Sequence, residues 1–153
     1  MSESLVRARF VGRSDLSLDE KGRLVVPSRF RERLGQRFYV TVGIPEPCLA
    51  LYPEEAWEHE VGRRLDEATI TDENYEAYGI YSRYVTQNTE EATLDGQGRF
   101  VIPPGLRAYA EIEREVVAIG YNTRIELWAK SRFSAAAPTA AEAKAMRIAL
   151  GLH

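Results

Sequence analysis

The chain contains one ten-residue segment twice, and this repeat constrains the fold more than any other feature of the sequence. The first copy, LDEKGRLVVP, begins at Leu18, and the second, LDGQGRFVIP, begins 76 positions later at Leu94. Further residues match at the same offset: Arg31 with Arg107, Leu49 with Ile125, Leu51 with Leu127, Tyr52 with Trp128, and Trp57 with Phe133. A stacked solenoid needs about three units or more. Two copies instead predict a pseudo-symmetric pair of similar halves.

Each copy reads as strand, tight turn, strand, short helix and two further strands. A turn is expected from Asp19, because the aspartate can bond its own backbone and the glycine that follows accepts a positive φ. The flanking segments 16–18 and 23–26 then predict a local β-hairpin. Pro27 and Pro103 each suit the first turn of a short helix. The later strands are expected at 38–42, 49–52, 115–119 and 125–128.

Between the copies, the sequence predicts two helices. Trp57, Val61 and Leu65 recur every four residues and form a stripe that can pack on a core. A second helix is expected from Asp72 to Tyr84. Its tyrosines could stack on nucleic-acid bases, but their helical spacing favours packing; they are Tyr75, Tyr78, Tyr81 and Tyr84.

A unit of about 45 residues with four short strands cannot bury a sufficient core alone. We therefore expect the two halves to pair face to face around one shared β core, with helices at the periphery, which is an α+β fold. Thr139 and Glu142 have capping-box spacing and predict a final helix. The expected divisions are repeat 1 at 13–58, a helical connection at 59–88, repeat 2 at 89–134 and a helical tail at 135–153.

The net charge of -3 hides an uneven distribution. Residues 1–37 carry nine basic and five acidic side chains, a balance of +4, while the remainder carries eleven basic and eighteen acidic ones, a balance of -7. A basic end of this kind indicates a polyanionic partner. A solvated face balanced by acidic helices elsewhere is an equal alternative.

Several classes of function are disfavoured by what the sequence lacks. The single Cys48 offers neither an internal disulfide nor a metal cluster, and suits a reducing cytoplasm. His59 and His153 have no neighbouring ligand or nucleophile, so we assign no catalytic or metal-binding residue and expect no cofactor. No apolar run approaches about 18 residues and no secretory signal is present. Neither a membrane nor a small-molecule substrate is expected as a partner.

The paired Asp-x-x-x-Arg turns, each followed by an apolar strand and a proline, resemble the MraZ family of bacterial regulators. The resemblance extends from about Phe10 to Phe133; its most specific part is residues 18–31, with a degenerate copy at 94–107. It implies two tandem half-barrels of the AbrB/SpoVT swapped-hairpin type that share one β core.

The resemblance also implies a function. Such a protein would be a sequence-specific DNA-binding transcriptional regulator of the division and cell-wall gene cluster, located in the cytoplasm at the nucleoid. It would bind double-stranded DNA at direct repeats upstream of its own operon, as a ring-shaped homo-oligomer. The alternative is a ring-forming protein-interaction scaffold whose basic face binds an acidic partner and has no specific DNA target.

The expected DNA-binding residues lie in the first copy. Arg23 directly follows the turn, where its guanidinium can reach a phosphate or clasp a guanine edge; its alternative role is a salt bridge to Asp19 that stiffens the turn. Asp19 is expected to organise the turn, since a carboxylate repels phosphate. Lys21 lies at the tip, where it would contact phosphate without reading sequence, or would be a solvated lysine. Arg13 is a further DNA-binding candidate from the basic segment.

The second turn offers a weaker surface for a polyanion. Asp95 and Arg99 are expected to be mainly structural counterparts of the first pair, because Gln97 stands where the first copy has a lysine. Arg7 and Arg9 are interpreted as a basic arm. Arg29, Arg31 and Arg33 are expected to point in different directions around a short helix. Arg31 matches Arg107, which indicates an ion pair either between subunits or within the chain.

Overall fold

Both halves of the chain build the same two antiparallel sheets in the computed structural model, which describes residues 9–43 and 47–152. The larger sheet has the strand order β1-β7-β8-β4-β3-β5, and the smaller pairs β2 with β6. The first copy supplies β1 (Arg13–Ser17), β2 (Arg23–Val25), β3 (Arg37–Val42) and β4 (Leu49–Pro53). The second supplies β5 (Glu90–Thr93), β6 (Arg99–Val101), β7 (Glu115–Tyr121) and β8 (Arg124–Ala129).

The two copies exchange their first strands. β1 pairs with β7, placing Arg13 opposite Ile119, and β5 pairs with β3, placing Thr93 opposite Arg37. The α+β class and the shared sheet are therefore confirmed. The predicted local hairpin is wrong: its turn closes through Asp19 N–H to the carbonyl of Arg23 at 3.0 Å, but the flanking strands enter different sheets. Each strand finds its hydrogen-bond partners in the other copy, which joins the halves through their backbones.

The offset of 76 does not hold along the whole repeat. Leu18 N–H donates to Arg114 O at 2.9 Å, and Leu94 N–H donates to Gln36 O at 3.0 Å. The third strands are thus related by an offset of 78, because the second copy has two more residues between Pro103 and β7 than the first has between Pro27 and β3. A shorter β7–β8 connection restores the offset of 76, and Ala50 lies opposite Glu126 between β4 and β8.

A single hydrophobic core joins the halves. The Phe38 and Phe100 rings, one from each copy, meet edge to face with centroids 5.1 Å apart. Leu18 and Leu94, which precede the two turns, are both buried in the same cluster. Short helices cover this core: α2 (Ser28–Leu34) and α6 (Pro104–Tyr109).

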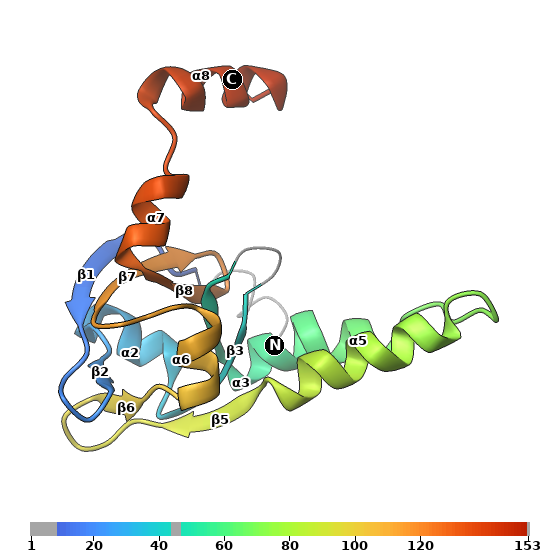
Figure 1. The fold of residues 1–153 in the computed structure, drawn as a ribbon, viewed down its shortest axis with the longest axis horizontal. Helices are drawn as coiled ribbons and strands as arrows, with labels where there is room; N and C mark the ends of the chain where they lie inside the picture. Colours follow the sequence, from blue (N-terminus) through green and yellow to red (C-terminus); the bar gives the residue numbers. More distant parts are fainter. Residues whose placement is uncertain (1–8, 44–46, 153) are drawn as a thin grey trace.

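A helical hairpin, defined here as residues 54–87, projects from one side of the sheets (Figure 1). Trp57 packs on Tyr39 with ring centroids 4.8 Å apart, so the predicted packing stripe is confirmed at its first residue. The hairpin consists of α3 (Glu54–Trp57), the π-helical turn η1 (Glu58–Gly62), α4 (Arg63–Asp66) and α5 (Tyr75–Gln87). No helix in the described part of the chain is long and apolar enough to cross a membrane.

The second helix of the hairpin begins three residues later than predicted. Asn74 accepts from the backbone N–H of Thr71 at 2.7 Å and so holds residues 71–74 in a turn. The packing interpretation of its tyrosines is correct for only part of the set. Tyr78 donates to Leu65 O at 3.0 Å, but Tyr75 and Tyr81 are 72% and 47% exposed.

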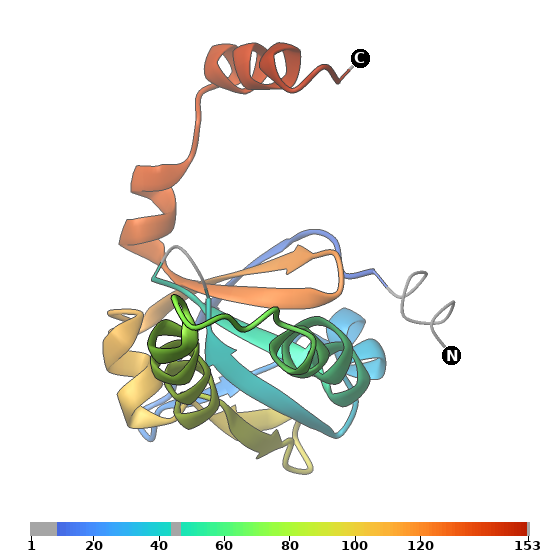
Figure 2. The ribbon, with the colours of Figure 1, turned by 90° about the vertical axis from the view of Figure 1, so that its right-hand side faces the viewer.

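The C-terminal segment leaves the sheets as α7 (Lys130–Ala136) and continues as α8 (Ala140–Ala149). The predicted capping box is confirmed: the hydroxyl of Thr139 accepts from Glu142 N–H, and the Glu142 carboxylate accepts from Thr139 N–H. Figure 2 shows α8 standing clear of the rest of the molecule.

Candidate nucleic-acid interface

The first turn is organised around the carboxylate of Asp19. One oxygen, Oδ1, accepts the backbone N–H groups of Lys21 and Arg23, each at 2.9 Å, and Oδ2 accepts Arg23 Nε at 2.6 Å. The bond from the Arg23 backbone is the largest of the effects that lower the pKa of Asp19 below its usual value. Asp19 therefore stays ionised and holds both the turn and Arg23. Its part in a DNA-binding site stays a prediction.

The second turn repeats this geometry. Asp95 Oδ1 accepts the N–H groups of Gln97 and Arg99 at 2.9 Å, and Oδ2 accepts Arg99 Nε at 2.8 Å. The Arg99 backbone N–H is the first cause of a lowered pKa at Asp95. In both turns, only Nε of the arginine is occupied by this ion pair, which leaves the other guanidinium nitrogens available to a further acceptor.

The smaller sheet places these turns at opposite ends of one ribbon. Arg23 lies opposite Val101 and Arg99 opposite Val25. Each strand also bonds the turn of the other copy: Val26 N–H donates to the carbonyl of Gly98 at 2.9 Å. Val25 and Val101 are 45% and 53% exposed, so each end of the ribbon presents an arginine beside an exposed valine. Both turns thus belong to one surface, which we name the ribbon face.

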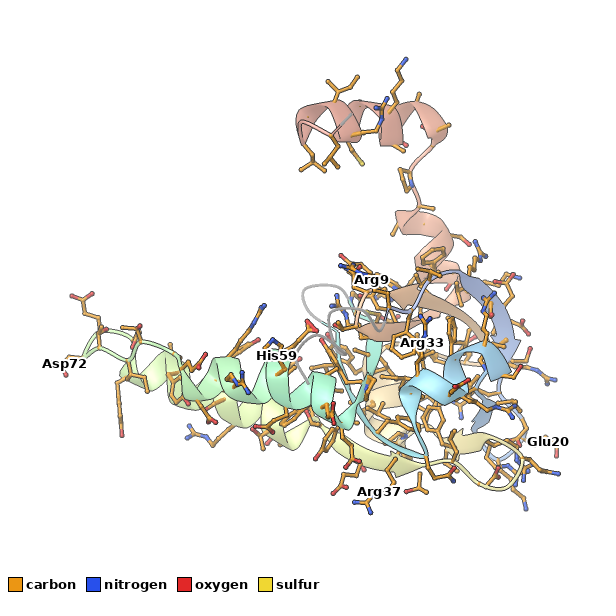
Figure 3. All side chains as sticks on the ribbon, turned by 180° about the vertical axis from the view of Figure 1, so that it is seen from behind. Arg9, Glu20, Arg33, Arg37, His59 and Asp72 are labelled. Carbon is orange, nitrogen blue, oxygen red and sulfur yellow. The ribbon has the colours of Figure 1, made fainter. Side chains whose placement is uncertain are left out.

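The two ends of the ribbon face have the same net charge but expose different charged groups. Glu20 and Lys21 are exposed at the tip of the first turn, and Figure 3 shows Glu20 at the edge of the molecule. Gly96 and Gln97 occupy the corresponding positions of the second turn. Among the described residues, Lys21 has no carboxylate within ion-pair distance. Its ammonium group is available to an anionic partner.

Arg31 and Arg107 support the turns from behind. Arg31 Nε donates to Val26 O at 2.7 Å and Arg107 Nε donates to Ile112 O at 3.0 Å. Neither forms an ion pair within the described ranges of the chain, so the intramolecular alternative is wrong. An ion pair with another subunit stays a prediction. Each guanidinium instead packs against the turn glycine of the opposite copy, Arg31 on Gly98 and Arg107 on Gly22.

Arg13 lies apart from the ribbon face. It is the first residue of β1, whereas the turn follows the last. Its Nε bonds Asp15 Oδ1 at 2.9 Å, and its guanidinium carbon is 5.2 Å from the centre of the Phe133 ring. The structure brings Asp19, Lys21 and Arg23 together but does not bring Arg13 to them. A role for Arg13 at DNA stays a prediction.

A second basic cluster escaped the sequence analysis. Arg9, Arg29 and Arg33 line one small hollow of about 190 Å³ with Phe30; Figure 3 labels Arg9 and Arg33. Arg29 donates to Arg13 O at 2.6 Å, and Arg33 donates to Arg9 O. Residues 29 and 33 are four apart and so share a helix face, which corrects the expectation that they diverge. Arg7, the other residue of the predicted arm, lies outside the described residues.

Within the described part of the chain, no group of three or more histidine, cysteine, aspartate or glutamate side chains is placed to hold a metal ion. The class of protein follows from the fold and the two turns. The chain is a duplicated, pseudo-twofold α+β protein with a β-ribbon surface, because its two copies exchange strands, share one core and each carry an aspartate–arginine turn.

Comparison with known proteins assigns this duplicated protein to a family. The MraZ protein family model matches residues 10–75 and 85–149. The chain is 39% identical over 124 residues to the transcriptional regulator MraZ of Moorella thermoacetica, covering 81% of this chain and 83% of that protein. It is 40% identical to the regulator of the same name from Desulforamulus reducens (81% and 84% covered) and 37% identical to that from Clostridium acetobutylicum (81% and 84%).

The chain therefore belongs to the MraZ family. The family is one of transcriptional regulators and not of enzymes. The resemblance inferred from the paired turns is confirmed.

Proposed function

We propose that the chain is a sequence-specific DNA-binding regulator of the division and cell-wall gene cluster, acting in the cytoplasm at the nucleoid. It binds direct repeats upstream of its own operon, and the ribbon face is its DNA-reading surface. The names of its relatives as transcriptional regulators support this assignment. The observation that carries it is the fixed presentation of Arg23 beside the free Lys21 at the end of an exposed two-stranded ribbon.

The dimensions and chemistry of this surface suit duplex DNA. The major groove admits a two-stranded β-ribbon, and arginine can bond both acceptors on the guanine edge. Because Asp19 holds Nε of Arg23, the guanidinium is oriented before DNA arrives. Exposed Val25 and Val101 offer apolar contact with thymine methyl groups. Lys21 supplies a phosphate contact that positions the ribbon.

The first turn is proposed as the main contact. It combines Lys21 and Arg23, whereas the second turn has Arg99 beside the uncharged Gln97. The first turn also belongs to the basic segment 1–37, and phosphate contacts and electrostatic steering both favour positive charge. Arg99 and Asp95 then act mainly as structural counterparts.

The active form is proposed to be a cyclic homo-oligomer. One turn can supply only about two or three phosphate contacts, and affinity at physiological salt rises with the number of phosphates neutralised. Several subunits on repeated sites raise avidity by roughly 10²–10⁴. Each half of a subunit is assigned to the AbrB/SpoVT swapped-hairpin type, and the β1–β7 and β5–β3 pairings support that assignment. The divisions proposed are 13–58, 59–88, 89–134 and 135–153.

The direct test is an electrophoretic shift with the DNA upstream of the protein's own gene, against a scrambled duplex of equal length. We expect specific retardation of the first duplex and an affinity that falls steeply with salt. Equal retardation of both duplexes would contradict sequence-specific recognition. Absence of binding to either would favour the alternative, a ring-forming scaffold whose basic face binds an acidic protein.

A further inference from the structure

Exposed apolar side chains are concentrated on two parts of the molecule. Twelve large ones are exposed among the described residues, and eight of them lie on the helical hairpin or the C-terminal segment. The hairpin has Ile70, Tyr75, Ile80 and Tyr81, and the C-terminal segment has Met146, Ile148, Leu150 and Leu152. Large apolar patches on soluble proteins mark interaction sites. Both segments therefore have the composition of a contact surface.

Helix α8 has no packing partner in its own chain. None of its ten residues is buried, and Figures 1 and 2 both show it clear of every other element. An isolated helix shorter than about 12–15 residues is marginal in water. The capping box at Thr139 and Glu142 stabilises only its first turn. Met146 and Leu150 lie four residues apart and so form one exposed apolar face that a partner could cover.

A groove suited to such a helix lies between the hairpin and the larger sheet. Its volume is about 460 Å³. Apolar side chains from both arms of the hairpin and from the sheet line it, among them Val42, Val61, Leu65, Ala68 and Val85. Tyr81, which is 47% exposed, stands at the same groove. An apolar helix face of α8 would find matching side chains there.

The two segments are also complementary in charge. Residues 54–87 of the hairpin carry nine acidic and three basic side chains. Residues 130–152 carry four basic side chains and one acidic, and that acidic residue, Glu142, is engaged in its own helix cap. Lys144 and Arg147 flank Met146 on α8. The opposite net charges of the two whole segments steer their association. The charged side chains that line the groove itself are Glu60, Arg64 and Arg124.

The groove of the same chain is out of reach of α8. Helix α7 packs on β7 and β8, and only Ala137 to Thr139 separate it from α8. Three residues span at most about 10 Å. In both ribbon views the helical hairpin and α8 project in separate directions (Figures 1 and 2). The occupant that carries the fitting helix is therefore a second copy of the chain.

We propose that α8 of one subunit docks in the groove between the helical hairpin and the sheet of the next subunit. This inference rests on the homo-oligomer of the proposed function and names its contact. Since helix and groove are different surfaces, the contact is heterologous, and repeated contacts of this kind close into a ring when the rotation allows. The ribbon face takes no part in the contact and stays open.

Site-directed disulfide formation tests the contact directly. Met146→Cys is introduced into one tagged preparation and Ala68→Cys into a second, and the two are mixed and oxidised. We expect a covalent dimer containing both tags. The control replaces Ala68→Cys with Glu20→Cys at the turn, where no cross-link should form. Each single variant is also oxidised alone, which shows whether any cross-link forms through the native Cys48.

A charge placed on α8 provides the second test. Met146→Glu puts a carboxylate into the apolar groove, which we expect to raise the dissociation constant of the assembly at least ~10-fold. The matched control Ala140→Glu adds the same charge in the first turn of α8 and should assemble like the wild type. Light scattering over a dilution series measures both.

The outcomes separate this contact from the proposed function. A wild-type protein that is monomeric would overturn the ring and the docking together. A wild-type oligomer that persists in Met146→Glu and yields no mixed cross-link would overturn the docking alone. Loss of assembly in Met146→Glu, together with the mixed cross-link, supports it.

Discussion

Arg31 of the first copy packs against Gly98 of the second, so closely that a Cβ on this glycine would lie 2.4 Å from the guanidinium carbon. The reciprocal pair is looser, since a Cβ on Gly22 would lie 3.3 Å from an outer nitrogen of Arg107. Both glycines have φ of +75°. Each half thus supports the turn of the other, with different clearance at the two ends of the ribbon face.

This difference in clearance predicts that a glycine-to-alanine substitution destabilises the fold more at Gly98 than at Gly22. We expect Gly22→Ala to lower the free energy of unfolding by roughly 1–2 kcal/mol, the cost of left-handed backbone for an alanine. Gly98→Ala should lower it by about 1 kcal/mol more, because Arg31 must move and give up its bond to Val26. Urea unfolding of both variants measures the difference, and equal losses would refute the buttressing role of Arg31.

The lowered pKa of Asp95 predicts that acid reduces the stability of the fold. The pKa of Asp95 is lower in the folded chain than its ordinary value of 3.8. Its ionised form therefore stabilises the fold above that value, and the contribution is lost as pH falls through the folded pKa. In Asp95→Asn this contribution is absent, so the urea midpoint should fall less between pH 5 and pH 3 than in the wild type. Parallel acid profiles would show that Asp95 contributes nothing.

The two turn arginines should separate structure from DNA binding. Arg23→Ala and Arg99→Ala each remove one partly exposed ion pair, so each should cost at most about 1 kcal/mol of stability. Operator affinity should fall at least ~10-fold in Arg23→Ala alone. Circular dichroism first confirms that each variant is folded, and light scattering confirms that it assembles. Each variant is then titrated with operator DNA. A folded, assembled Arg99 variant that cannot bind, beside an Arg23 variant that binds normally, would reverse the assignment.

Lys21 predicts a change in salt dependence. Lys21→Gln gives the first turn the side chain that the second has at Gln97, and should reduce the slope of log K against log salt by about 0.9 for each engaged subunit. Gln97→Ala is the matched control and should leave the slope unchanged. Fluorescence anisotropy at several salt concentrations gives both slopes. An unchanged slope in Lys21→Gln would show that Lys21 makes no phosphate contact.

The turns could be predicted from sequence because their chemistry is local. An aspartate, a glycine and an arginine within five positions specify the bonds that Asp19 makes, and Asp95 repeats them. The strand exchange could not be predicted in this way. A closed hairpin and an exchanged one share the same turn, and only the distant β7 and β3 decide which backbone β1 and β5 will bond.

Two other features depended on tertiary context. In β7 the two copies are related by an offset of 78 and not 76. This change is evident only from the backbone hydrogen bonds that join Leu18 to Arg114 and Leu94 to Gln36. The spacing of four between Arg29 and Arg33 indicated that they share a helix face. Their proximity to Arg9 could not be predicted in this way, because Arg9 lies outside that helix, before β1.

The exchange of first strands determines when the protein can form during its synthesis. Arg13 meets Ile119, so β1 has no partner until more than a hundred further residues have left the ribosome. Such long-range pairing is slow and leaves strand edges exposed meanwhile. A nascent first copy therefore carries its Asp19–Arg23 turn on an unfinished sheet. Only a chain translated through β7 can hold that turn in the strand pairing of the complete protein.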